Sequence, residues 1–202
     1  AAAQLFTQVR AALFRGRSLD TLSQVEITES FRYMREDLLR TAYGTYACEL
    51  MDEMVKEKQR QESAYLLLLT TLHLLNTPDL DPEPIRRAYE LKLLSVLGFR
   101  PSLEQCVACG SDPGPAPVVH FAPALGGVLC PTCPSEGEVV HRVSRGALET
   151  MKRLLAGDLR RAHVIRISGE TGAELDRVLT DYITSRTEKP IKSKKFLDDL
   201  LI

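Results

Sequence analysis

The sequence predicts a mainly α-helical protein, in which a helical bundle carries an embedded four-cysteine metal-binding element and follows a short β remnant. Three observations support this fold class. Apolar residues recur at three- and four-residue steps over most of the chain. Two Cys-x-x-Cys pairs, CVACG (106–110) and CPTC (130–133), interrupt that pattern. Ahead of it, residues 5–23 have the pattern of two strands around a turn.

Size and composition limit the classes of protein to consider. The chain has 202 residues, of which 44% are hydrophobic and 26% charged, as in ordinary soluble globular proteins. No apolar run approaches the roughly 20 residues of a membrane span, and no signal-peptide pattern is present at the start, where Ala1 stands in place of Met. The net charge of −1 indicates no partner by itself.

The β remnant precedes the helices. Short apolar runs, Leu5-Phe6 and 11–14, are broken by Arg15-Gly16-Arg17, which predicts two strands around a turn. Because two strands are not stable alone, we expect them to be the tail of a larger β unit.

Helical periodicity begins at about Val25. The first predicted helix carries an apolar stripe at Ile27, Phe31, Met34, Leu38, Ala42, Tyr46 and Leu50. The second, over 62–76, is apolar nearly all round and is expected at the centre of the bundle. The third begins at Pro82 after the N-cap Asp81 and ends at Gly98.

Further elements follow the cysteines. Ser144 is expected to cap a helix whose apolar positions are Ala147, Leu148, Met151, Leu154 and Leu155. The next helix has its apolar face at Leu175, Val178, Leu179, Tyr182 and Ile183. Between them, residues 162–168 alternate as a short strand would, and 192–202 predict one or two helical turns.

The two cysteine pairs predict a structural zinc site. Four thiolates form a preferred tetrahedral ligand set for zinc, here Cys106, Cys109, Cys130 and Cys133. A hairpin around 123–127 would return the second pair to the first. Because four thiolates close the coordination sphere, the zinc would be a structural cofactor rather than a catalytic one.

Other interpretations of the cysteines fit less well. A thioredoxin-like redox pair at Cys130 needs a strand before it and a helix opening at it, which the flanking glycines and proline do not favour. A zinc deaminase needs His-x-Glu, which none of the four histidines begins. His120 would be a superfluous fifth ligand and is expected on the hairpin surface. The fifth cysteine, Cys48, is expected to be a small buried residue; an odd count without secretory signals fits a reducing cytosol.

No catalytic constellation is found, so the chain is not expected to be an enzyme. Phosphate-loop, dinucleotide and nucleophile-elbow motifs are absent from the sequence. The carboxylate pairs consist of residues adjacent in sequence, whose side chains point about 100° apart on a helix. They are therefore expected on solvent-exposed helix faces and not as acid/base pairs: Glu36-Asp37, Asp52-Glu53 and Asp198-Asp199.

Basic clusters are the remaining candidates for function. One runs from 186 to 195 and has a local balance of +4, from Arg186, Lys189, Lys192, Lys194 and Lys195 against one acid. A smaller group near Phe14 consists of Arg10, Arg15 and Arg17. Gathered cations bind phosphates, and aromatic neighbours can stack on bases. The alternative is a solubilising tail.

A third basic feature is the pair Arg86-Arg87 at the start of the third helix. Beside Tyr89 it could receive the acidic, apolar end of a peptide. The alternative is that these arginines simply pair with Glu83 and Glu90.

The order of motifs resembles the RecO family of bacterial recombination mediators. The resemblance rests on Tyr46-x-x-x-Leu50, then RRAYELKLLSVLGFRPSLEQCVACG, then GGVLCPTC and the ending KPIKSKKFLDDL, and it runs from about residue 5 to the end. It implies an N-terminal OB-fold, of which 1–24 would be the C-terminal part. Residues 25–202 would form the α-helical domain, with the zinc-binding insertion at about 101–142.

The resemblance also implies a function. It is that of a non-catalytic mediator of the RecF pathway of DNA repair, located in the bacterial cytoplasm at the nucleoid. Such a protein binds single- and double-stranded DNA, anneals strands and, with RecR, promotes RecA loading on DNA coated by the single-stranded-DNA-binding protein. The basic cluster and the Arg10 group would then contact DNA, and Arg86 and Arg87 would bind that protein's acidic C-terminal tail. The alternative is a zinc-stabilised module that recognises an acidic peptide and touches DNA only through partners.

Overall fold

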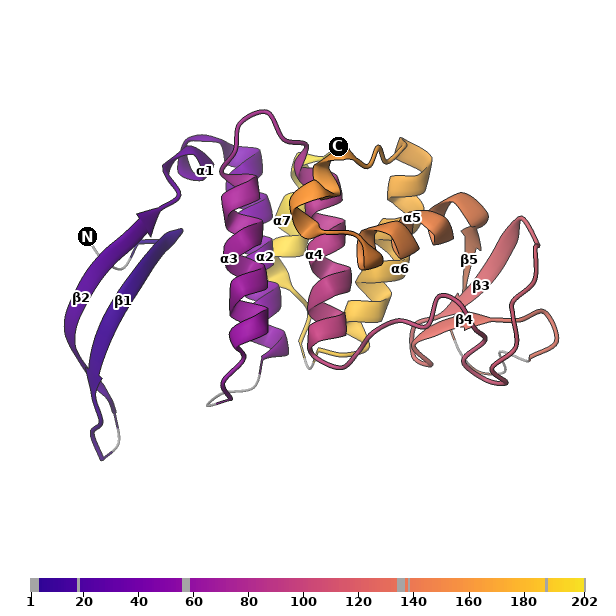
Figure 1. Ribbon diagram of the computed structural model, residues 1–202, viewed down its shortest axis with the longest axis horizontal. Helices are drawn as coiled ribbons and strands as arrows, with labels where there is room; N and C mark the ends of the chain where they lie inside the picture. Colours follow the sequence, from indigo (N-terminus) through magenta and orange to yellow (C-terminus); the bar gives the residue numbers. More distant parts are fainter. Residues whose placement is uncertain are drawn as a thin grey trace.

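The computed structural model describes residues 4–17, 19–55, 59–133, 137, 139–187 and 189–201. A β hairpin lies at one end of the molecule, a helical body in the middle and a small sheet at the other end (Figure 1). The hairpin pairs β1 (Thr7–Phe14) with β2 (Thr21–Ser30) antiparallel. The helical body begins with α1 (Arg32–Glu36), α2 (Leu38–Met54), α3 (Glu62–Leu75) and α4 (Pro82–Val96).

The small sheet and the remaining helices follow. The sheet has the order β4-β3-β5, from β3 (Val118–Ala122), β4 (Gly127–Leu129) and β5 (His141–Ser144), and both pairings are antiparallel. Then come α5 (Arg145–Ala156), the 3₁₀ helix η1 (Leu159–Val164), α6 (Gly169–Thr184) and α7 (Lys192–Leu200). Among the described residues, no helix combines the length and apolar character that a membrane crossing requires.

The hairpin confirms two strands around the Arg15–Arg17 turn, but the strands are longer than predicted. Residues 25–30 continue β2 and are not helical, because Val25 and Ile27 pair with Ala11 and Val9 of β1. Their two-residue spacing suits a strand, and the partner strand supplies backbone hydrogen bonds that a helix would otherwise provide. Membership of an OB-fold stays a prediction.

The first predicted helix is also divided. Asp37 has extended backbone angles and its side chain accepts a hydrogen bond from the Arg40 amide, so it caps α2 and separates it from α1. Ala42, Tyr46 and Leu50 are buried as predicted, whereas Leu38, in the first turn of α2, is 61% exposed.

The central helix is α4 and not α3. The predicted limits of α3 are correct to one residue, yet Tyr65 and Leu66 are exposed. Every residue of α4 from 84 to 91 is buried, because α2, α3, α5, α6 and η1 all contact it. Its caps are as predicted: the Asp81 carboxylate accepts from the Glu83 amide, and Gly98 has a φ of +88° just beyond the helix.

The C-terminal elements confirm most expectations. The Ser144 hydroxyl accepts from the Ala147 amide and starts α5, and the five predicted apolar positions of α6 are all buried. The final segment forms α7. The predicted strand at 162–168 is wrong: residues up to Val164 belong to η1, because the Asp158 carboxylate caps that turn and Leu159 and Ala162 are buried three residues apart.

Candidate metal centre and basic surfaces

The four cysteines come together because a turn and a hairpin meet. After α4 the chain makes a tight turn in which the Gly110 amide donates to the Cys106 carbonyl at 2.8 Å, and Gly110 takes a φ of +76° that suits glycine. The β3–β4 hairpin carries Cys130 at its end. Backbone bonds then join the two parts: the Val107 amide donates to the Val128 carbonyl, and the Val128 amide to the Ser102 carbonyl, both at 2.9 Å.

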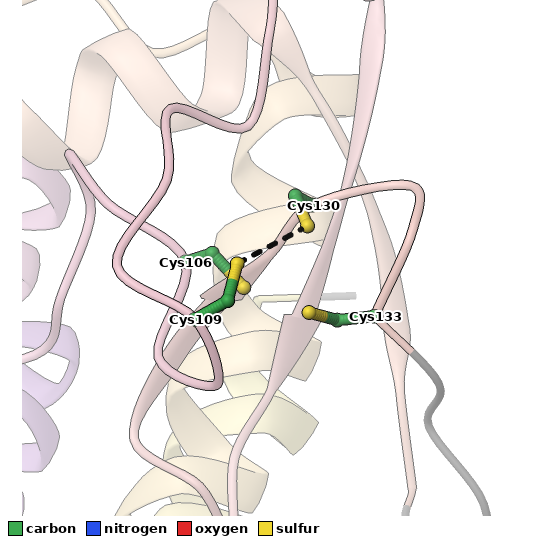
Figure 2. Close-up of side chains that lie close together, drawn as sticks. All are labelled: Cys106, Cys109, Cys130 and Cys133. Atoms are coloured by element: carbon green, nitrogen blue, oxygen red, sulfur yellow. Dashed lines mark hydrogen bonds between the residues drawn. The ribbon is translucent and has the colours of Figure 1, made fainter.

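The cysteine side chains fit a tetrahedral metal ion. Their four Sγ atoms lie within 4.8 Å of one another, and the Cys109 and Cys130 sulfurs are 3.7 Å apart (Figure 2). Zinc–sulfur bonds of about 2.3 Å in a tetrahedron place sulfurs about 3.8 Å apart. The four sulfurs are therefore close enough to hold one metal ion, and His120 lies outside the site, exposed on β3.

Two of the sulfurs each have a hydroxyl group within hydrogen-bonding distance. The Ser111 Oγ is 3.0 Å from the Cys109 Sγ, and the Thr132 Oγ1 is 3.1 Å from the Cys130 Sγ. The hydrogen bond from Thr132 lowers the pKa of the Cys130 thiol to about 5, whereas hydrogen bonds with Cys109 and Cys130 raise the pKa of the Cys133 thiol to about 12. Cys48 is different, because burial in an apolar setting raises the pKa of its thiol to about 11.

The metal element is held to the helical body through Arg186 and Tyr182. The Tyr182 hydroxyl donates to the Phe99 carbonyl at 2.9 Å, and the Arg186 guanidinium lies over the rings of Phe99 and Tyr182. Arg186 Nη2 also donates to the carbonyls of Pro123 and Ala124 at 3.3 and 3.2 Å, within the hairpin turn. In this conformation Arg186, predicted as a DNA contact, joins α6 to the hairpin that carries Cys130.

Arg86 and Arg87 lie in the interior and not on a surface. Both side chains are at most 3% exposed, and both donate to the Glu83 carboxylate. Arg87 also pairs with Glu90, itself 1% exposed, at 3.2 Å and with Asp176 of α6 at 2.7 Å. The alternative that these arginines pair with Glu83 and Glu90 is confirmed. Their predicted contact with an acidic peptide would require such a peptide to displace these carboxylates.

The Asp176 carboxylate extends this network to α7. It also accepts from Lys194 Nζ, which in turn contacts Asp198 at 2.5 Å. Burial alone would raise the pKa of Asp176, but the charge and hydrogen bond of Arg87, with help from Lys194, outweigh it and lower that pKa to about 2. Glu83, Arg86, Arg87, Glu90, Asp176, Lys194 and Asp198 form what we call the ionic cluster.

The cations predicted to bind DNA thus divide into two groups. Lys194 and Arg186 have internal partners, whereas Lys189, Lys192 and Lys195 are exposed around the start of α7. We call these three the α7 lysines. At the hairpin, Arg15 and Arg17 are exposed, and Arg10 pairs with Glu26 on the neighbouring strand at 3.1 Å.

One residue that sequence reasoning missed positions the α7 lysines. The Glu49 carboxylate of α2 accepts from the backbone amides of Lys192 and Ser193 at 3.0 and 2.7 Å. It therefore caps α7 in place of Ile191, which has no side-chain acceptor. Hydrogen bonds from Ser193 and Lys192 outweigh desolvation and lower the pKa of Glu49. No local signal reveals this cap, because the two segments lie 143 residues apart.

Comparison with known proteins decides the family. The family model for the C terminus of recombination protein O matches residues 35–195. The chain is 67% identical over 201 residues to DNA repair protein RecO of Symbiobacterium thermophilum, covering 99% of this chain and 79% of that protein. This chain belongs to the RecO family.

More distant RecO proteins agree over the same span. DNA repair protein RecO of Pelotomaculum thermopropionicum is 38% identical over 198 residues, which are 98% of this chain and 75% of that protein. The RecO protein of Roseiflexus sp. is 36% identical over 197 residues, 98% of this chain and 69% of its own. The resemblance inferred from the motif order is thereby confirmed, and the chain is a DNA repair protein of this family.

The metal centre yields a first prediction. Purified protein should contain about one zinc ion per chain by elemental analysis, and Cys130→Ser should lose most of it together with thermal stability, because three thiolates and a hydroxyl bind zinc less tightly. Cys48→Ser is the matched control and should keep the metal. Equal metal loss in both variants, or a metal-free wild-type protein, would contradict the assignment.

The ionic cluster yields a second prediction. Arg87→Ala should lower the free energy of unfolding by about 3–5 kcal/mol, because it leaves Glu90 buried without its cation. Urea unfolding monitored by circular dichroism measures this. Arg177→Ala, an exposed arginine next to Asp176 on α6, should change the free energy by about 0.5 kcal/mol or less. If Arg87→Ala does not fold, Arg87→Lys should still fold, with reduced stability. Stability equal to that of the wild type in either variant would contradict the conclusion that Arg87 neutralises the buried carboxylate of Glu90.

Proposed function

We propose that this chain is a non-catalytic, DNA-binding recombination mediator. In this proposal it binds single- and double-stranded DNA, anneals complementary strands and, together with RecR, promotes RecA loading on DNA coated by the single-stranded-DNA-binding protein. Membership of a family of DNA repair proteins supports the general part. The observation that carries DNA binding is the set of α7 lysines, which the ionic cluster and Glu49 position with their side chains exposed.

The neighbourhood of these lysines suits a phosphate backbone. Lys189, Lys192 and Lys195 are exposed, and the adjacent Phe196 is 45% exposed and could stack on an unpaired base. Ammonium groups on flexible stems contact phosphates as point charges, without reading base sequence. Binding at this surface is therefore expected to be independent of sequence and sensitive to salt.

The zinc centre has a supporting part in this proposal. Four thiolates leave no coordination position for a substrate, so the ion would stabilise the fold of its element rather than take part in chemistry. By joining the turn at Cys106 to the hairpin end at Cys130, it would hold the turn that Arg186 contacts. DNA binding then depends on zinc only through the stability of the fold.

The peptide-binding alternative has a different candidate position. A crevice of about 360 Å³ lies between α5 and the segment that follows α4, and Arg100, Leu103 and Leu155 line it. Lys152 and Glu104 also line it and pair with each other at 3.3 Å, so Arg100 is the cation that an acidic group would contact. Cations beside apolar walls suit an acidic, apolar peptide end. Within the proposal, the acidic tail of the single-stranded-DNA-binding protein would bind in this crevice more readily than at Arg86 and Arg87, which are buried and paired.

The third prediction tests DNA binding. Replacing Lys189, Lys192 and Lys195 together by alanine should weaken binding of a labelled single-stranded oligonucleotide at least tenfold at low salt, about 50 mM. The slope of log affinity against log salt should decrease by about 2, since each phosphate contact contributes about 0.7. Fluorescence anisotropy across a salt series measures both quantities.

A control variant and a second ligand complete that experiment. The control is Arg32→Ala with Arg60→Ala, which removes two exposed arginines that each pair with a glutamate. Because those cations already have carboxylate partners and lie outside the α7 lysines, this variant should bind DNA as the wild type does. The second ligand is an acidic peptide with an apolar end. Binding of that peptide without any binding of DNA would overturn the proposal and favour the peptide-recognition alternative.

A further inference from the structure

A second group of cations lies at the end of α5, on η1 and just after η1. Residues 152–166 contain five basic residues against one acid, a balance of +4 equal to that of the 186–195 run. Four of the five are exposed arginines, which we call the α5–η1 arginines: Arg153, Arg160, Arg161 and Arg166. They lie outside the metal centre, the ionic cluster and the α7 lysines.

The fold directs these arginines outward. In a 3₁₀ helix, residues three apart share a face, and Leu159 and Ala162 are buried on the inner face of η1 against α3 and α4. Arg160 and Arg161 lie between those two anchors and are exposed as a consequence. The helix is thus an amphipathic turn with an arginine-bearing outer face.

The turn before η1 is firmly held. Lys92 of α4 donates from Nζ to the carbonyls of Leu155 and Gly157 at 3.0 and 2.5 Å, at the end of α5. The Asp158 carboxylate accepts from the Arg160 amide at 2.9 Å and caps η1. The backbone that carries Arg153 and Arg160 is therefore fixed by contacts that leave their side chains unused.

These arginines lack the partners that other exposed arginines have. Arg10 and Arg32 pair with Glu26 and Glu36, at 3.1 and 2.8 Å. No comparable ion pair or side-chain hydrogen bond joins any α5–η1 arginine to another residue in the described ranges, and the one acid in the stretch, Asp158, is bonded to backbone. Exposed guanidinium groups at the end of α5, on η1 and just after it, without a side-chain partner in the described ranges, form a site for a polyanion.

The α5–η1 arginines and the α7 lysines occupy different parts of the helical body. The helix η1 contacts α3 and α4, whereas α7 contacts α2. In Figure 1, η1 (orange) crosses in front of α4 and α7 (yellow) lies behind the same layer of helices. One strand could therefore occupy the α7 lysines while the α5–η1 arginines remain accessible.

We propose that the α5–η1 arginines bind the phosphate backbone of a second nucleic-acid strand. This inference rests on the proposed function and adds that one molecule of the protein holds two strands at once. Guanidinium groups bind phosphate oxygens in pairs of parallel hydrogen bonds and hold them more specifically than ammonium groups do. Because the contacts are to phosphates, the second strand is bound whatever its sequence.

The test is a bridging experiment with two non-complementary strands. A biotinylated oligothymidine is immobilised sparsely, the protein is added below the amount of that strand, and capture of a second, fluorescent oligothymidine is measured. Wild-type protein should capture the second strand, while Arg160→Glu with Arg161→Glu should still bind the first strand and lose at least tenfold in capture of the second. Thermal unfolding should be unchanged, since both side chains are exposed.

Controls separate this inference from the proposed function. The variant Arg160→Lys with Arg161→Lys keeps both positive charges and should retain most of the bridging. The variant Arg32→Glu with Arg60→Glu changes the net charge by the same amount as the Arg160/Arg161 glutamate variant, but at arginines that are paired, and should bridge as the wild type does. Equal bridging by the Arg160/Arg161 glutamate variant, or binding of only one strand by the wild type, overturns the inference and leaves the proposed function standing. Failure of the wild type to bind even the first strand overturns both.

Discussion

The ionic cluster is the constraint on which the arrangement of the helices depends. The central helix α4 buries two arginines and a glutamate, and burying unpaired charges is costly. Glu83 and Glu90 supply part of the compensation from α4 itself, and Asp176 must supply the rest from α6. The same carboxylate then binds Lys194, so that α7, which packs on α2, is also joined to this network. The hydroxyls of Tyr43 and Tyr46 donate to Glu83 and Glu90 and add α2 to the network.

This constraint explains why similar basic residues have different roles. Arg86, Arg87 and Lys194 neutralise internal carboxylates, and Arg186 holds the hairpin of the metal element. Exposed cations remain at the hairpin tip, at the start of α7 and along α5 and η1. The near-zero net charge does not reveal this division, because it sums cations that are paired in the interior with cations that are exposed.

Features with a local cause could be predicted from the sequence, whereas features that depend on distant partners could not. The caps at Asp81 and Ser144 and the turn at Gly110 each depend on a few neighbouring residues, and the four cysteines could be grouped because the hairpin between them has its own turn signal. In contrast, Val25 and Ile27 fit a helical stripe as well as a strand, and only pairing with β1 decides between them. Nothing near Arg87 identifies Asp176, which lies 89 residues away. The local charge balance of the sequence therefore indicates where cations are frequent, and the fold determines which of these cations are exposed and could contact DNA.

Neighbouring lysines at the start of α7 offer the most direct test of this division. Lys194 is 8% exposed and bonded to Asp176 and Asp198, whereas Lys195 is exposed. Each is replaced by glutamine, and both the free energy of unfolding and the affinity for a single-stranded oligonucleotide are measured well below the melting temperature. We expect Lys194→Gln to lose about 1–3 kcal/mol of stability and to keep its DNA affinity, and Lys195→Gln to keep its stability and lose affinity. The reverse pattern, or equal effects of the two substitutions on both quantities, would contradict the division of the cations into internal and DNA-binding groups.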